Sequence, residues 1–151
     1  MKDEKLTQKL EQFFQTEENK TEQDLQSIFF YPFHSDMRFL LFEVMGYHGD
    51  YGITLHSMID FGKNLNTNAK GESLIDLPGF TYAITIPVDP KEEIELFELA
   101  NEFIVEWFID RFHQAGGVSF PYDCYLMWHD DVTAIDMKKR VRIDTELLYN
   151  E

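Results

Sequence analysis

The chain of 151 residues carries 28 acidic but only 13 basic residues, which gives a formal net charge of −15. Because affinity for phosphates depends on lysine and arginine, this charge disfavours nucleic acids and membrane surfaces as direct ligands and favours a basic protein as partner. A single cysteine, Cys124, excludes an internal disulfide, and the absence of a signal peptide or a bilayer-spanning run of ~20 apolar residues predicts a cytoplasmic protein.

The N-terminal segment, residues 5–30, has a helical pattern. Apolar residues recur at helical spacing over 5–15, namely Leu6, Leu10, Phe13 and Phe14. The polar residues 17–20 are expected to interrupt this helix. A second, short helix is expected to begin at Thr21 and to end before Pro32.

Residues 37–60 predict a β-hairpin with Gly49-Asp50 at its tip. One face of this hairpin carries Leu40, Phe42, Val44, Ile53, Leu55 and Ile59. The opposite face is mixed and carries Leu41, Glu43, Met45, Tyr47, Thr54, His56, Met58 and Asp60. Regular alternation on both arms supports this interpretation, since a slip by one residue would exchange the faces. A helix from Ser35 to Met45 is the alternative.

The next two segments are a loop and a strand. Residues 61–79 are rich in glycine and asparagine and predict a mobile loop, with Leu74 and Leu77 as anchors. Such a loop is either functional or a plain connection. Residues 80–88 alternate between apolar and small polar side chains, which predicts a strand.

Residues 90–114 predict the longest helix. Asp89-Pro90 is a typical helix start, and Gly116-Gly117 a typical end. More than half of its circumference is apolar, through Ile94, Phe97, Ala100, Phe103, Ile104, Trp107, Phe108 and Phe112. The remaining face carries an acidic stripe of Glu98, Glu102, Glu106 and Asp110. Because the helix is apolar over so much of its surface, it must be covered both by a sheet and by the N-terminal helix.

The C-terminal segment, residues 120–148, predicts further strands. Tyr122, Cys124, Leu126 and Trp128 alternate with Asp123, Tyr125, Met127 and His129. Another strand is expected from Val132, and alternation over 141–147 predicts a last strand, with a helix as the alternative. The chain 1–151 is therefore expected to be a single α+β domain, an antiparallel sheet of about five strands with the long helix packed on one face and the N-terminal helix beside it.

No sequence pattern predicts a catalytic residue, a cofactor or a metal ligand. The polar residues of the hairpin, His48, Asp50, His56 and Asp60, lack the spacing of a zinc site, and the two histidines fall on opposite faces of the predicted strands. Glycine-rich phosphate loops and nucleophile elbows are absent. Cys124 lies among apolar neighbours and is expected to be buried and inert.

The function predicted by this elimination is that of a non-enzymatic acidic protein-binding domain, an inhibitor or immunity-type protein that neutralises a basic partner. Its predicted binding residues are the acidic stripe and, on the mixed sheet face, Tyr47, His56 and Met58. A DNA-mimic antagonist is one alternative, because four helical residues rise about 6 Å, as phosphates do along a strand. A small metal-dependent hydrolase using His129, Asp130 and Asp131 is another.

Overall fold

A computed structural model describes residues 2–47, 50–60, 63–74, 81–85, 93–129 and 131–148, with the backbone alone at residues 2, 3, 5, 6, 47, 81–85 and 93–101. The two α-helices are α1 (Lys2–Phe29) and α2 (Glu93–Gln114). The strands are β1 (Phe39–Tyr47), β2 (Asp50–Asp60), β3 (Lys63–Asn64), β4 (Thr81–Thr85), β5 (Asp123–Trp128), β6 (Thr133–Asp136) and β7 (Val141–Asp144). The described residues also include the short 3-10 helices η2 (Gly117–Ser119) and η3 (Thr145–Leu148).

The strands form one mixed sheet in the order β3-β2-β1-β5-β6-β7, and β4 pairs with the other end of β2. The seven strands therefore occupy six positions, because β3 and β4 share the outer side of β2. All neighbours are antiparallel except β1 and β5, which are parallel. The α+β class is confirmed, whereas the predicted antiparallel sheet of about five strands agrees only roughly with this mixed sheet, which contains one parallel pair. A parallel pair requires a crossover connection, and α2 provides it.

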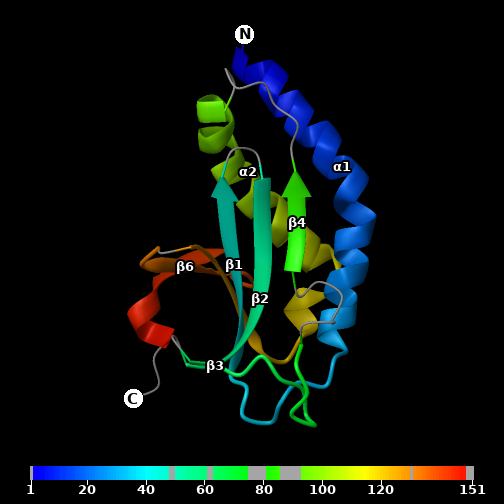
Figure 1. Cartoon of the computed structure of the whole chain (residues 1–151), viewed down its shortest axis with the longest axis vertical. Helices are drawn as coiled ribbons and strands as arrows, with labels where there is room; N and C mark the ends of the chain where they lie inside the picture. Colours follow the sequence, from blue (N-terminus) through cyan, green and yellow to red (C-terminus); the bar gives the residue numbers. More distant parts are fainter. Residues whose placement is uncertain are drawn as a thin grey trace.

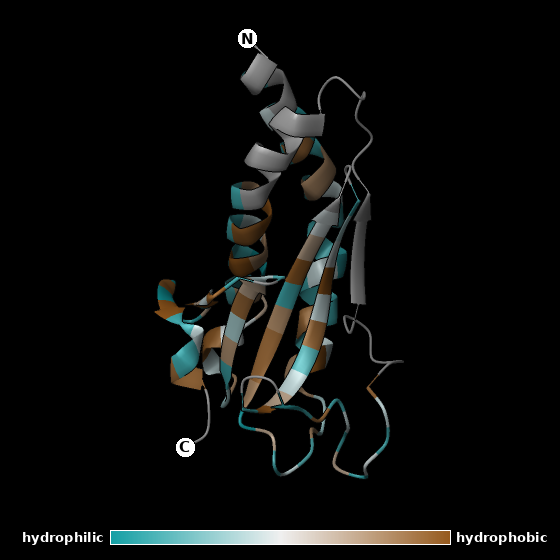
Figure 2. Ribbon diagram, turned by 60° about the vertical axis from the view of Figure 1, so that its left-hand side comes forward, coloured by the Kyte–Doolittle hydropathy of each residue, from teal (hydrophilic) through white to brown (hydrophobic). Residues whose placement is uncertain are grey.

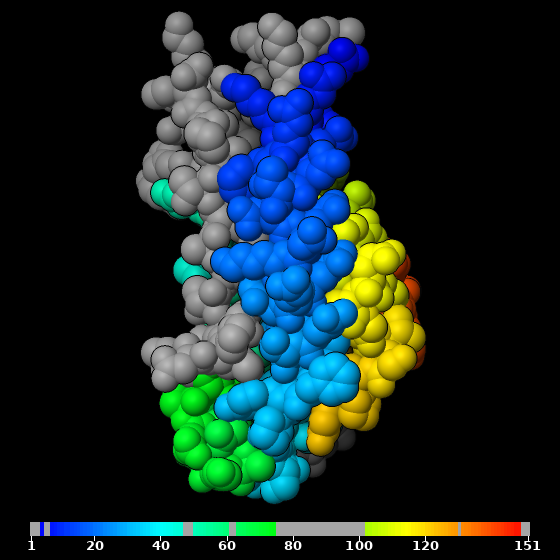
Figure 3. Space-filling view, turned by 90° about the vertical axis from the view of Figure 1, so that its right-hand side faces the viewer, coloured from blue at the N-terminus to red at the C-terminus, as the bar shows by residue number. Residues whose placement is uncertain are grey.

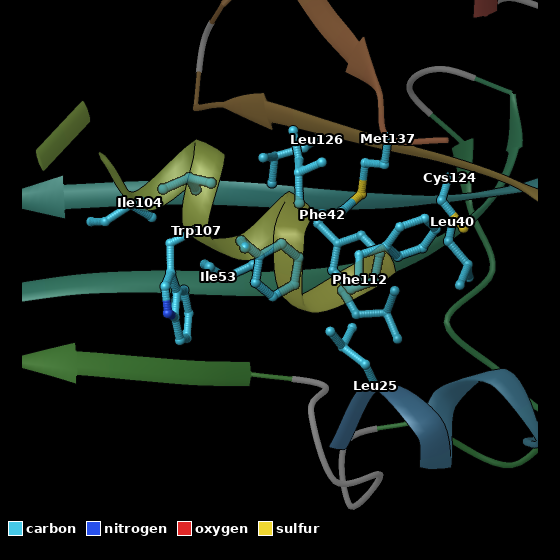
Figure 4. Packing of buried hydrophobic residues seen from close by; sticks show 14 of the residues in the cluster. Leu25, Leu40, Phe42, Ile53, Ile104, Trp107, Phe112, Cys124, Leu126 and Met137 are labelled. Atoms are coloured by element: carbon cyan, nitrogen blue, oxygen red, sulfur yellow. The ribbon is translucent and has the colours of Figure 1, made fainter. Parts of the chain in front are cut away.

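Both helices cover one face of the sheet (Figure 1), and they lie side by side along the molecule (Figure 3). The side chains between them and the sheet form the main core (Figure 4), which includes Leu25, Phe42, Ile53, Trp107, Phe112 and Leu126. Along the central strands, brown and paler bands follow one another (Figure 2), as expected for strands whose side chains alternate between two faces. The long helix was predicted to be covered by both the sheet and the N-terminal helix. This is confirmed for the part of α2 whose side chains are described.

The N-terminal segment is one continuous helix, so the predicted interruption at residues 17–20 is wrong. The buried stripe continues through Thr21 and Leu25, while Asn19 and Lys20 face solvent. The run of polar residues is thus the outer surface of an amphipathic helix. Arg111 of α2 supports this region, because its Nη1 lies 2.7 Å from Oε1 of Glu22 and 3.5 Å from Oε2 of Glu18.

The hairpin of β1 and β2 has the predicted faces but a different register. Tyr47 pairs with Asp50, so the connecting residues are His48 and Gly49 rather than Gly49-Asp50. Those two residues lie outside the described part. The predicted pairing was displaced by two residues, and such a shift keeps every side chain on its face. The helical alternative for residues 35–45 is excluded by β1.

Residues 63–74 of the predicted loop make defined contacts with β2. The amide of Ser57 donates to Oδ1 of Asn66, and the amide of Asn66 donates to Oγ of Ser57, each at 2.9 Å. Leu74 is buried, as predicted for an anchor, and Leu77 lies outside the described residues. The strand predicted over 80–88 is present as β4. The helix start at Asp89-Pro90 also lies outside the described part.

The second face of the sheet is covered at one end by the C-terminal segment. A smaller cluster joins Phe39, Leu41, Met58, Tyr125, Met127, Ala134 and Leu148. The predicted last strand over 141–147 ends early, at Asp144, and continues as η3. The turn is fixed by Oδ1 of Asp144, which accepts the amide of Glu146 at 3.0 Å, and by the burial of Leu148 in this cluster. Burial, with Asp123 and Asp136 nearby, raises the pKa of Tyr125 to about 12, so its phenol stays neutral.

Cys124 is predicted to be unreactive in the folded protein. Its thiol lies in the main core, and burial raises the pKa of the thiol. Because the thiolate is the reactive form, a disulfide reagent such as Ellman's reagent should modify native protein far more slowly than urea-unfolded protein. The rate of thiol release measures this difference. Equal rates for the two states would contradict the placement of Cys124 in the core.

Candidate functional site

A groove of about 640 Å³ lies beside α2. We call it the α2 groove. It is lined by Glu102, Val105, Glu106, Ile109, Trp128, Ile135, Arg140 and Arg142. The sheet places these residues together, because Leu126, Ile135 and Arg142 are partners across β5, β6 and β7. These three cross-strand partners run from β5, which α2 covers, outward to β7. The outer strands therefore form one wall of the groove, and the helix forms the other.

The floor of the α2 groove is apolar. Ile109 is buried, and Val105, Trp128 and Ile135 are partly buried and pack against the main core. Their inner sides are fixed by the core, while their outer sides remain accessible. A volume of about 300–1,000 Å³ is typical of ligand sites in proteins, and an apolar floor with a few charged groups around it is their usual chemistry.

The walls of the groove carry charges of both signs. On α2, Glu102 and Glu106 are exposed, and within the described residues neither has an ion-pair partner. Asp110 differs, because its Oδ1 lies 2.7 Å from Nη2 of Arg140. On the opposite wall, Nη1 of Arg142 donates to Oγ1 of Thr133 at 3.2 Å. The acidic stripe therefore divides into a neutralised end at Asp110 and two available carboxylates.

The turn between β6 and β7 holds Arg140 in place against α2. Arg140 adopts a positive φ of 59°, and its amide donates to the carbonyl of Asp136 at 2.7 Å. The carboxylate of Asp136 accepts the amides of Lys138 and Lys139, each at 3.1 Å. Nζ of Lys138 donates to the carbonyl of Phe120. The side chains of Lys138 and Arg140 thus point to separate partners, the carbonyl of Phe120 and the carboxylate of Asp110.

Glu98, the first residue of the predicted stripe, lies in α2, but its side chain is outside the described part. Glu102, Glu106 and Asp110 follow on the same face of the helix, as predicted. Sequence reasoning did not find the groove beside them. The alternation of β5 indicated which residues face the helix, but the pairing of β6 and β7 that brings Arg140 and Arg142 to α2 has no local signal.

The predicted binding residues of the mixed sheet face differ in their burial and in their contacts. Met58 is buried in the smaller cluster and offers no surface to a partner. The side chain of Tyr47 is outside the described part. Nε2 of His56 lies 3.5 Å from Oε1 of Glu43, whose Oε2 lies 3.0 Å from Nδ1 of His129. Sequence reasoning missed this His56–Glu43–His129 cluster, because only the parallel pairing of β1 and β5 brings His129 to Glu43.

The two described residues of the hydrolase alternative, His129 and Asp131, contact different partners. Oδ1 of Asp131 accepts the amides of Val132 at 2.7 Å and Thr133 at 3.2 Å, so this carboxylate fixes the turn into β6. Asp130 lies outside the described part, and His129 contacts Glu43. Within the described ranges, no group of three or more histidine, cysteine, aspartate or glutamate residues could hold a metal ion.

No protein-family model, no curated protein and no solved structure matches this chain. In the described segments, neither helix is long and apolar enough to cross a lipid bilayer. Function is therefore inferred from the geometry and charge of the molecule itself.

Proposed function

We propose that this chain is a non-enzymatic protein-binding domain that takes a basic, partly apolar segment of its partner into the α2 groove. The observation that carries the proposal is the position of two carboxylates without ion-pair partners among the described residues, Glu102 and Glu106, directly beside an accessible apolar floor. In such a site, burial of apolar surface supplies affinity, and the charges select the partner and steer its approach. A domain of this kind can neutralise a basic protein, as inhibitors of the immunity type do.

The net charge of −15 supports the same class of partner. A strongly negative protein attracts basic proteins over a distance and accelerates their association. The ion pair of Asp110 with Arg140 limits the alternative of DNA mimicry, because a copy of a phosphate backbone needs an unbroken acidic array. Two arginines in the wall opposite Glu102 and Glu106 interrupt that array.

A peptide of alternating lysine and leucine is a suitable probe for the groove. Binding is measured by isothermal titration calorimetry to the wild type and to the double variant Glu102→Lys/Glu106→Lys. The matched control is Glu11→Lys/Glu72→Lys, which makes the same charge change at exposed positions away from the groove. Because close charge pairs contribute roughly 1.5 kcal/mol or more each, we expect the groove variant to bind at least about tenfold more weakly. The control variant should lose little affinity for the peptide.

A lysine–serine peptide of the same length tests the floor. It should bind the wild type more weakly than the lysine–leucine peptide, since it lacks the side chains that would cover Val105, Trp128 and Ile135. If the two double variants lose affinity equally, binding follows net charge and the groove is not the site. If the two peptides bind equally, the apolar floor takes no part.

A further inference from the structure

Among the described strands, β7 is the outermost one of the sheet on the side away from β2. It is a short strand of four residues, and Val141, Arg142 and Asp144 are exposed along it. An outer strand offers unpaired backbone groups to any further strand that can lie beside it. The outer edge of β7 can therefore accept an additional strand.

The backbone groups of Arg142 and Asp144 point toward this open edge. The amide of Thr145 donates to the carbonyl of Val132, its antiparallel partner, so Thr145 faces β6. The backbone N–H and C=O groups of successive residues point to opposite sides of a strand. Those of Ile143 and Val141 therefore also point to β6, whereas those of Arg142 and Asp144 point outward. The pairing of β5 with β6 gives the same result independently, because the bond from Met137 to Cys124 leaves Asp136 and Ala134 facing β7.

The charges along this edge change sign about Ile143. If a second copy of β7 lies antiparallel with the two Ile143 residues opposite each other, Arg142 of each copy faces Asp144 of the other. Opposite charges in direct cross-strand positions attract, and like charges repel. An outer strand that carries charges of one sign only would repel a second copy of itself. The order Arg142, Ile143, Asp144 instead places opposite charges next to each other in an antiparallel pair.

Three exposed apolar side chains lie in β7 or close to its ends. Val141 is 48% exposed, Val132 is 71% exposed and Leu147 is 74% exposed. Val132 precedes β6, and Leu147 lies in η3, directly after β7.

We propose that the chain forms a two-fold symmetric dimer in which β7 pairs antiparallel with β7 of a second copy, with Arg142 opposite Asp144 and Ile143 on the symmetry axis. The pairing joins the two sheets into one and places the two α2 grooves on the same face of it. Arg142 also lines the α2 groove, but the dimer does not rest on the proposed function, because neither Glu102 nor Glu106 takes part in it and its test measures oligomeric state without any groove ligand. So short an edge forms a weak dimer rather than an obligate one.

Sedimentation velocity of the full chain at high micromolar concentration tests the dimer. At physiological ionic strength, the Debye length of about 8 Å screens the general repulsion between two acidic chains but not the close Arg–Asp pairs. We expect a mass near twice the 17.9 kDa of one chain. Arg142→Asp and Asp144→Arg each place like charges opposite each other twice, and each should weaken the dimer by about tenfold or more.

Restoration of charge complementarity separates this register from a loss of folding. The double variant Arg142→Asp/Asp144→Arg should dimerise again, because opposite charges face each other once more. An equimolar mixture of the two single variants should form a heterodimer although neither dimerises alone. A monomeric wild type would overturn the proposal, and so would a dimer that both single variants leave intact, or single variants that neither the double variant nor the mixture rescues.

Discussion

Replacement of Trp107 by alanine is expected to lower the free energy of unfolding by about 3–5 kcal/mol. The indole is only 7% exposed and lies between the two helices, with its ring 4.6 Å from that of Phe14. Removing it leaves a cavity in the core that the sheet and α1 share with α2 (Figure 4). Domains of this size are stable by about 5–15 kcal/mol, so such a loss would bring a domain at the lower end of this range close to unfolding.

Urea denaturation followed by circular dichroism measures the effect of Trp107→Ala without relying on tryptophan fluorescence. Phe30→Ala is the matched control, because it also removes an aromatic ring but from a position that is 89% exposed. The control should change stability by no more than about 0.5 kcal/mol. A loss under about 1 kcal/mol for Trp107→Ala would show that α2 is peripheral to the core.

Gly46→Ala is expected to destabilise the protein by about 1–3 kcal/mol, as overpacking does. A β-carbon at Gly46 would lie 2.3 Å from Cδ1 of Tyr51, its cross-strand partner. The ring of Tyr51 is buried in the main core and cannot move aside without displacing its neighbours. The hairpin therefore requires glycine at this position for space.

Gly52→Ala is the internal control for the same hairpin. Gly52 lies next to Tyr51 in β2, and a β-carbon there would have no atom within 4 Å. Alanine should be neutral or stabilising by up to about 1 kcal/mol, because it restricts the unfolded chain. Thermal unfolding of both variants measures the difference. Equal stabilities would contradict the observed pairing of β1 and β2.

The two faces of the hairpin and of β5 could be predicted from sequence because side chains alternate with a period of two. The same property explains the error in the hairpin register. A displacement of two residues keeps Phe42 and Ile53 on the core face, so alternation does not detect it. Only the observed pairing of Tyr47 with Asp50 fixes the register.

The continuity of α1 was not predicted, because a run of polar residues such as 17–20 is also typical of a helix end. Glu18 and Glu22 instead bind Arg111 of α2, a residue 89 positions away from Glu22 in the chain. The ion pair of Asp110 with Arg140 and the contact of Glu43 with His129 are also made by distant segments. No local pattern contains such information, so the acidic stripe was predictable and the groove was not.

Site-specific photo-crosslinking in the cells that produce the protein tests the α2 groove as the binding site most directly. A benzophenone side chain is placed at Val105, in the floor of the groove, or at Met45, an exposed apolar position on the opposite face of the sheet. We expect the Val105 derivative to capture a partner whose crosslinked peptide, identified by mass spectrometry, is rich in lysine or arginine. Glu102→Lys/Glu106→Lys should abolish this capture. Capture from Met45 and none from Val105 would contradict the proposal and assign binding to the other sheet face.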